Sequence, residues 1–334
     1  MSKRYLFASA GVLLLILLAV NLAVSFATRN SIPRQVMARA RRFPQAVVEV
    51  LGNSLMGAGF DEATFNRTMG LDRNGGSLNL ALGGSTPVEQ LLLLRYSLQN
   101  RIHPRLLLYG FYDFQLTDPI SLTTADLIGN RAVLYYLEPE YGRGFYHLSF
   151  HDRVEFEIMR QFPMTVDRGA IWAKVERLRR EMSRQGMPPE KSNRFGIARD
   201  FSLLEAANTA EFVKECNQGA TAGLIAPVEE LIRQGEDGGA KILFIEMPMP
   251  PAHLRAFYET PAWTHYTAHL RALLEPSGVE FLDASHWFGD TSLFADSLHL
   301  TEAGAVEFSE RLGKFLRDPG RASKSRVDNS LAVR

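Results

Sequence analysis

Three side chains from two distant parts of this chain of 334 residues are suited to one reaction. Ser54 follows an apolar run that ends in Gly52-Asn53, and Asp296 lies three residues before His299. A serine hydroxyl is a weak nucleophile until an adjacent base removes its proton. A histidine can be that base, and an aspartate can orient its ring and stabilise its charged form. Together they predict nucleophilic acyl transfer.

Acyl transfer also needs hydrogen-bond donors where negative charge develops on the carbonyl oxygen. The backbone amides of Ser54 and Gly84 are candidates, because Gly84 lies in a Gly-Gly-Ser turn and a glycine lets substrate approach the backbone closely. Tyr112 and Asp113 follow another apolar run. The Tyr112 hydroxyl is a third candidate donor, whereas Asp113 is expected to bond backbone near the pocket.

Short apolar runs predict the strands that must position these residues. They cover residues 46–51, 78–82, 106–109, 241–246 and 279–282. Runs without strict alternation suit strands buried on both faces of a parallel sheet. Capping patterns begin helices between them, at Thr86 with Pro87 and Glu89, and at Thr301. The alternation predicts an α/β layer, whose ligands collect at the carboxyl ends of the strands.

Four motifs in this order resemble the blocks of the SGNH/GDSL hydrolase family. They are residues 51–54 (LGNS), 79–85 (NLALGGS), 107–113 (LLYGFYD) and 296–300 (DSLHL). Asn53 stands where the family has Asp, and Tyr112 stands where it has an Asn that donates to the oxyanion. The resemblance covers about residues 46–114 and 240–316. It implies a three-layer α/β/α fold with a mainly parallel five-stranded, flavodoxin-like sheet, and a catalytic set of Ser54, Asp296 and His299 with Gly84 at the oxyanion.

The N-terminus carries an apolar run over residues 6–27, preceded by Lys3 and Arg4. A helix of this length is about 33 Å long, enough for the ~30 Å hydrocarbon core of a bilayer. We expect an uncleaved membrane anchor over residues 1–28, with a cleaved signal peptide as the alternative. Five arginines follow between residues 29 and 42, and the positive-inside rule would keep them in the cytoplasm. The chain nevertheless resembles membrane-anchored extracytoplasmic members of the family, which have such variant blocks and look like O-acyltransferases or esterases acting on cell-surface polysaccharide. From this resemblance we place the catalytic domain on the periplasmic side.

The rest of the chain divides by composition. We expect a connector over residues 29–45 and an SGNH-like domain over 46–317. Residues 115–218, too long for one crossover, are expected to form a helical insertion. Residues 318–334 are polar and are expected to be a disordered tail.

Several other functions lack a sequence signal. The 37 basic residues balance the 37 acidic ones, so there is no basic excess of the kind nucleic-acid-binding proteins usually show. The single cysteine, Cys216, excludes an intramolecular disulfide and a Cys-rich zinc module. No lysine follows the glycine turn in the P-loop position, and His147 with His151 lacks a third ligand, so we expect no cofactor and no metal. Asp283 and His286 form a second Asp-x-x-His pair, an alternative to the first.

The leading expectation is a serine esterase or O-acyltransferase that acts through an acyl-enzyme on acylated, for example acetylated, cell-envelope or extracellular polysaccharide. Its expected partners are that ester substrate, the membrane and an envelope-assembly protein. One alternative is a catalytically silent module of a polysaccharide assembly complex. The other is a lipid esterase.

Overall fold

The computed structural model describes residues 3–71, 75–118, 134–135, 137–146, 148–162, 171–172, 174–175, 178–179, 182 and 209–318. The chain divides into two compact units, which we describe separately. One joins Met1–Ala38 to Leu122–Pro188, and the other joins Arg39–Ser121 to Pro189–Arg334. Apart from residue 318, the tail that we expected to be disordered lies outside the described residues, as does much of the expected insertion.

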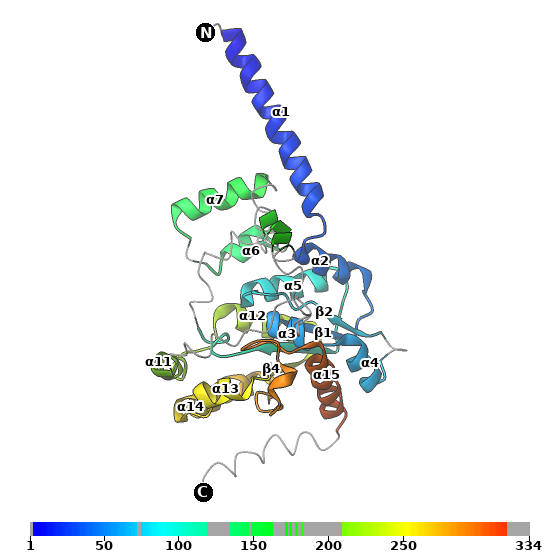
Figure 1. Ribbon diagram of the computed structural model, residues 1–334, viewed down its shortest axis with the longest axis vertical. Coiled ribbons are helices and arrows are strands. Elements are labelled where there is room, and N and C mark those ends of the chain that lie inside the picture. The colour runs from blue at the N-terminus through cyan, green and yellow to red at the C-terminus, as the bar shows by residue number, and fades with distance from the viewer. Residues whose placement is uncertain are drawn as a thin grey trace. The chain divides into compact units, whose positions relative to one another are not determined.

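The second unit is built on a five-stranded parallel sheet with the order β2-β1-β3-β4-β5. Figure 1 labels its strands β1, β2 and β4. The strands are β1 (Val48–Gly52), β2 (Ser77–Asn79), β3 (Leu106–Phe111), β4 (Lys241–Glu246) and β5 (Glu280–Asp283). The chain leaves β1 toward β2 on one side and continues through β3 on the other. A doubly wound sheet places its ligand site at this switch, outside the carboxyl ends of β1 and β3.

Helices cover both faces of the sheet and confirm the predicted α/β class. On one face lie α5 (Pro87–Gln99) and α12 (Ala226–Asp237), and on the other lie α3 (Ser54–Gly59), α4 (Glu62–Met69) and α15 (Glu302–Arg317). The remaining helices of this unit are α11 (Thr209–Gly219), α13 (Pro251–His253), the π-helical turn Leu254–Tyr258, α14 (Pro261–Leu274) and the 3₁₀ turns Glu275–Ser277 and Thr291–Leu293.

Two helices begin at the predicted caps. The Glu89 carboxylate accepts a 2.7 Å hydrogen bond from the N–H of Thr86, which completes the capping box of α5. At α15 the Thr301 hydroxyl accepts from the N–H of Gly304 at 3.2 Å. Each cap satisfies an amide that has no partner inside the helix, so each confirms the predicted start.

Two glycines at the ends of neighbouring strands let α3 pack directly on the sheet. Gly52 and Gly110 are register partners in β1 and β3. A Cβ on Gly110 would lie 2.7 Å from the Cβ of Met56 in α3, and one on Gly52 would lie 2.5 Å from the carbonyl oxygen of Gly110. Because only glycine fits at both positions, the helix that begins at Ser54 lies against the strand ends.

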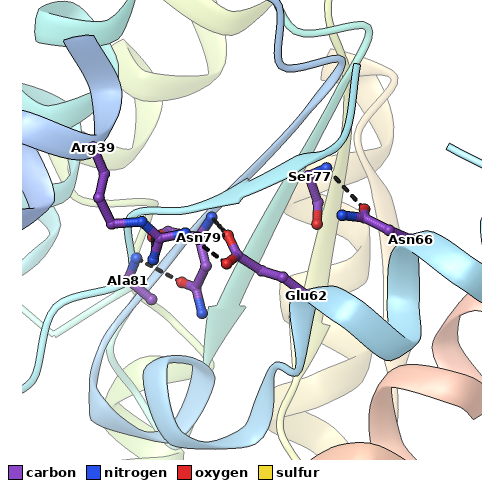
Figure 2. A network of polar contacts seen from close by, with 6 residues as sticks. All are labelled: Arg39, Glu62, Asn66, Ser77, Asn79 and Ala81. Carbon is purple, nitrogen blue, oxygen red and sulfur yellow. Dashed lines mark hydrogen bonds and ion pairs between the residues drawn. The ribbon is translucent and has the colours of Figure 1, made fainter. Parts of the chain in front are cut away.

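The edge strand β2 is held by an ion pair from outside the sheet. Figure 2 shows the Glu62 carboxylate at the start of α4 bonded to Arg39 at 2.5 and 2.7 Å and to the N–H of Asn79 at 2.5 Å. Arg39 belongs to α2 (Ile32–Arg42) and also donates to the carbonyl of Asn79 at 3.3 Å. The amide oxygen of Asn79 accepts from Ala81 at 2.9 Å. These contacts position the segment that leads to Gly84.

The predicted strands differ from the observed ones mainly at their ends. β2 ends at Asn79 rather than at residue 82, and the Asn79 side-chain oxygen accepts from the N–H of Ala81. The N–H groups of Leu80 and Leu82 still bond to β1 carbonyls at 2.8 and 2.9 Å. β3 continues through Gly110 to Phe111, past the predicted end, because the glycine remains extended within the sheet.

The first unit contains α1 (Lys3–Thr28), α6 (Pro139–Arg143) and α7 (Phe150–Gln161). Within the described residues, one helix is long and apolar enough to cross a membrane: Phe7–Thr28, with a mean hydropathy of 2.5 and no part of its apolar window buried. Arg143 joins α6 to α7 through a 2.7 Å ion pair with Glu157. Phe156 and Met159 are buried between these elements and their neighbours.

Candidate active site

The nucleophile candidate lies where the sheet topology places a ligand site. Ser54 is the first residue of α3, directly after β1. Asn53 caps this helix, because its side-chain oxygen accepts a 2.9 Å hydrogen bond from the N–H of Leu55. The Ser54 hydroxyl oxygen lies 2.8 Å from Nε2 of His299. The structure thus brings together two residues that are 245 positions apart in the chain.

Asp296 orients the histidine from its other side. Both carboxylate oxygens lie 2.9 Å from Nδ1 of His299. One of them also accepts hydrogen bonds from the N–H groups of Leu298 at 2.8 Å and His299 at 2.7 Å. Burial alone would raise the pKa of Asp296, but the hydrogen bonds from His299 and Leu298 and the charge of the imidazolium together hold it below its ordinary value.

This arrangement defines the direction of proton transfer. With Asp296 ionised, Nδ1 of His299 carries a proton and donates a hydrogen bond to the carboxylate. Nε2 is then the free acceptor and takes the hydrogen bond from the Ser54 hydroxyl. A histidine in this tautomer can remove the serine proton as an ester carbonyl is attacked.

A pocket of about 340 Å³ opens at the Ser54 hydroxyl. Gly84 lines it with φ of 68°, a left-handed conformation that favours glycine. Tyr112 and Asp113 also line it, from the loop after β3. The structure therefore gathers the sequence candidates around one cavity: Ser54 with the Asp296–His299 pair, and Gly84, Tyr112 and Asp113 on its walls.

Gln115 joins three loops of the site and was missed by the sequence analysis. Its side-chain oxygen accepts a 3.0 Å hydrogen bond from Asn53, and its side-chain nitrogen donates to the carbonyl of Ser85 at 3.4 Å. The residue before the nucleophile, the glycine turn and the loop after β3 are thereby tied together. The available signal was a polar side chain two residues beyond Asp113, in an otherwise aromatic stretch.

Asp113 is held in a strained conformation by a buried polar group. Its φ is 49°, in the left-handed region that non-glycine residues rarely adopt. The Tyr258 hydroxyl donates to the Asp113 carboxylate at 2.7 Å and accepts from the Asp113 N–H at 3.2 Å. It also lies 2.8 Å from the Glu246 carboxyl at the end of β4. Glu246 and Tyr258 were not among the sequence candidates, although an acidic residue ending an apolar strand is a visible signal.

Burial determines the proton positions in this group. Burial raises the pKa of Glu246 well above its usual range, and the negative charges of Asp283 and Asp113 add to the effect. A protonated Glu246 can donate to Tyr258, which leaves the single phenolic proton for Asp113. Burial, with the charge of Asp113, likewise raises the pKa of Tyr112. Tyr112 therefore stays a neutral phenol that can donate a hydrogen bond into the pocket.

The other candidate residues from the sequence are the second Asp-x-x-His pair, Asp283 and His286, and the possible metal ligands His147 and His151. Asp283 accepts from the N–H of Ser285 at 3.0 Å and from its hydroxyl at 2.5 Å, so its nearest partner is Ser285 and not His286. His147 lies outside the described residues. In the part of the chain that the structure describes, no group of three or more acidic, histidine or cysteine side chains is arranged to hold a metal ion.

Comparison with known proteins yields structural relatives only. No family model and no curated protein sequence matches the chain. Its fold is similar to the crystal structure of TesA, with 12% identity and a TM-score of 0.38 over 81% of this chain and 97% of that one. A putative acylhydrolase from Bacteroides fragilis NCTC 9343 has 12% identity and a TM-score of 0.37 over 83% and 91% of the two chains. A GDSL-like lipase from Bacteroides thetaiotaomicron VPI-5482 has 11% identity and a TM-score of 0.34 over 83% of this chain and 96% of that one.

Proposed function

We propose that this protein is a serine hydrolase or acyltransferase of the SGNH type. The observation that carries the proposal is the continuous hydrogen-bonded series from the Ser54 hydroxyl through both ring nitrogens of His299 to the Asp296 carboxylate, with links of 2.8 and 2.9 Å. Such a series activates a serine for attack on an ester. It opens into a pocket large enough for a small acyl group.

In the proposed reaction Ser54 attacks the ester carbonyl carbon and its proton moves to Nε2 of His299. The resulting oxyanion accepts hydrogen bonds from the amides of Ser54 and Gly84 and from the Tyr112 hydroxyl. Collapse of the intermediate breaks the ester C–O bond, and His299 returns the proton to the leaving alcohol. The acyl group then remains on Ser54 as an ester.

The second half decides between the two activities. An acceptor hydroxyl gives its proton to His299 and attacks the acyl-serine, which restores the Ser54 hydroxyl when the intermediate collapses. Water as acceptor makes the protein an esterase, and a sugar hydroxyl makes it an O-acyltransferase. Polar side chains among the residues that line the pocket, Asn53, Ser85, Thr86 and Asp118 beside those already named, can bond sugar hydroxyls, and this supports a sugar ester over a lipid ester.

We further propose that α1 anchors the chain in a membrane and that the domain works on the periplasmic side. The apolar length of Phe7–Thr28 supports the anchor. The side assigned to the domain depends on the family resemblance and on the expected polysaccharide substrate.

A fluorophosphonate probe tests the mechanism. The full chain in detergent is treated with the probe and the adduct is located by mass spectrometry. We expect an adduct on Ser54 that is absent from Ser54→Ala and strongly reduced in His299→Ala, with Ser309→Ala labelled as the wild type is. No adduct in a protein with an intact thermal unfolding transition would refute the enzyme and favour the silent assembly module.

Acceptor and acyl group are tested on the active protein. Release of acetate from an acetylated polysaccharide, compared with transfer of the acetyl group to a second, unacetylated glycan, separates hydrolysis from transfer. Aryl esters of two and twelve acyl carbons separate a short-acyl enzyme from a lipid esterase. A preference for the longer chain would overturn the sugar-ester assignment.

A further inference from the structure

The outer face of α7 is apolar where a water-facing helix would be polar. Its exposed apolar residues at every fourth position, together with Phe162 just after the helix, form what we call the α7 stripe: Phe150, Val154, Ile158 and Phe162. Phe150 is 84% exposed and Ile158 is 51% exposed. The same helix buries Phe156 and Met159 on its other side. The α7 stripe is therefore an additional apolar surface, separate from the packing that holds the helix in place.

A second stripe occurs in the same compact unit. The described residues between 171 and 182 are helical, and their exposed apolar members form what we call the Trp172 stripe: Trp172, Val175, Leu178 and Met182. The spacing of three and four residues places them on one face. Trp172 is 71% exposed, and tryptophan is enriched where a membrane meets water.

The Trp172 stripe is tied to the end of the apolar helix α1. The ammonium group of Lys174 donates a 3.0 Å hydrogen bond to the carbonyl oxygen of Ala27. Ala27 is the last but one residue of the helix that is long enough to cross a bilayer. If α1 spans a membrane, Lys174 and its neighbour Trp172 lie at the level of the headgroups on that side.

We propose that the α7 stripe and the Trp172 stripe lie in the membrane–water interface, with their apolar side chains inserted among the lipids. The proposal rests on the anchor proposed above. An amphipathic helix lies in the plane of the interface with its apolar face at the boundary between headgroups and acyl chains. The occupant of both stripes is thus the lipid bilayer itself, and the unit that carries α1 contacts it through three segments.

The mixed charge of α7 defines the kind of lipid surface. The helix carries three acidic residues and two arginines, with Asp152 and Arg153 adjacent in its first turn. Binding is therefore driven by apolar insertion and does not require anionic lipid. Vesicles of zwitterionic phosphatidylcholine are sufficient for the test.

Single fluorescent labels on the full chain test the inference. A cysteine replaces Ile158 in the α7 stripe, Arg153 outside the stripe on the same helix, or Leu15 within α1. Cys216 is fully buried and its pKa is raised to about 12, so it stays unlabelled. Each labelled protein is reconstituted in phosphatidylcholine vesicles that contain lipid brominated either near the headgroup or near the chain end, which quenches fluorescence on contact.

We expect the label at 158 to be quenched by the shallow bromine at least about twofold more than the label at 153, because only the stripe enters the acyl boundary. The label at 15 should respond most to the deep bromine. Equal quenching at 158 and 153, with label 15 still quenched, would overturn the interfacial stripe and leave the anchor intact. Fluorescence energy transfer between the labels at 158 of two protein copies, without quenching by lipid, would show that the stripe contacts a second copy. That result would also overturn the interfacial proposal. Absence of quenching at 15 would refute the anchor itself.

Discussion

The Tyr258 hydroxyl donates a 2.7 Å hydrogen bond to the Asp113 carboxylate and accepts a 3.2 Å one from the N–H of the same residue. One hydroxyl therefore holds both the side chain and the backbone of Asp113. A left-handed conformation costs a non-glycine residue about 1–3 kcal/mol and persists only where its surroundings impose it. Tyr112, the neighbour of Asp113, lines the pocket beside Ser54. Tyr258 is thus a positioning residue for that wall.

Tyr258→Phe is expected to lower kcat on an aryl acetate about tenfold while changing KM little, because the loss of about 1.4 kcal/mol of hydrogen bonding loosens Asp113 and Tyr112 rather than removing a contact to substrate. Glu246→Gln should retain most activity, since a neutral amide can replace a protonated carboxyl as donor to Tyr258. Steady-state kinetics checks both, with Tyr96→Phe on α5 as control. A raised KM with kcat unchanged would contradict the positioning role.

Tyr112→Phe is expected to lower kcat by about 100- to 1000-fold, the range for loss of one oxyanion donor. The phenol stays neutral because burial and the Asp113 charge raise its pKa, so it keeps the proton that it donates. Tyr112→Asn, which restores an amide donor, should recover part of the loss. Acetyl-ester hydrolysis at saturating substrate is the measurement. Wild-type kcat in the Phe variant would show that the two backbone amides act alone.

Glu49→Gln is expected to stabilise the protein at pH 8 and to have little effect at pH 5. Glu49 is completely buried in β1, and that burial raises its pKa to about 8, with a smaller opposing effect from the Ser97 hydroxyl. The folded state binds this proton more tightly than the unfolded state. The contribution of protonated Glu49 to the free energy of unfolding is therefore fully present below the ordinary pKa of a glutamate. It falls as pH rises toward 8, by up to about 1.4 kcal/mol for each pH unit.

The melting temperature of the full chain in detergent, recorded from pH 5 to 8 for wild type and Glu49→Gln, provides the check. The difference between the two should grow with pH, whereas the exposed Glu307→Gln should follow the wild type. A pH-independent difference would show that Glu49 does not titrate in this window.

Glu62→Gln is expected to lower the free energy of unfolding by about 1–2 kcal/mol, because it removes the half-buried pair with Arg39 and weakens the hold on Asn79. Arg39→Gln should cost a similar amount. The double variant should lose less free energy of unfolding than the two single variants lose together, since both changes break the same contact. Thermal unfolding measures all three. Glu310→Gln removes an exposed pair with Lys314 and should have almost no effect. Strict additivity would contradict the shared contact.

Local patterns predicted those elements whose signals lie within a few residues. The run KILFIE matches β4 residue for residue, because a lysine begins it and a proline-rich turn follows. The caps at Thr86 and Thr301 depend on hydrogen bonds that span three residues. The extent of β2 was overestimated, since an apolar run does not reveal where the regular strand ends, even though Leu80 and Leu82 still bond to β1.

Local sequence patterns could not predict hydrogen bonds between residues that lie far apart in the sequence. Gln115 reaches Asn53 over 62 positions, and Tyr258 reaches Asp113 over 145. Neither residue belongs to a recurring motif, so only the folded chain shows what they hold. Ser54, Asp296 and His299 were nevertheless selected, because nucleophile, base and orienting acid have characteristic neighbours in sequence. Their assignment as catalytic residues remains a prediction until the probe experiment is done.

The two compact units are interleaved along the polypeptide. The candidate catalytic residues Ser54, Asp296 and His299 all belong to the unit of Arg39–Ser121 and Pro189–Arg334, while Leu122–Pro188 belongs with Met1–Ala38. The chain thus passes from one unit to the other after residues 38, 121 and 188. A fragment made by cutting off the N-terminal helix alone would keep the central segment of the other unit but remove Ala27, the hydrogen-bond acceptor of Lys174. Crystallisation or secretion of the unit that holds the candidate site therefore calls for two deletions and a loop that joins residues 121 and 189, not for one deletion.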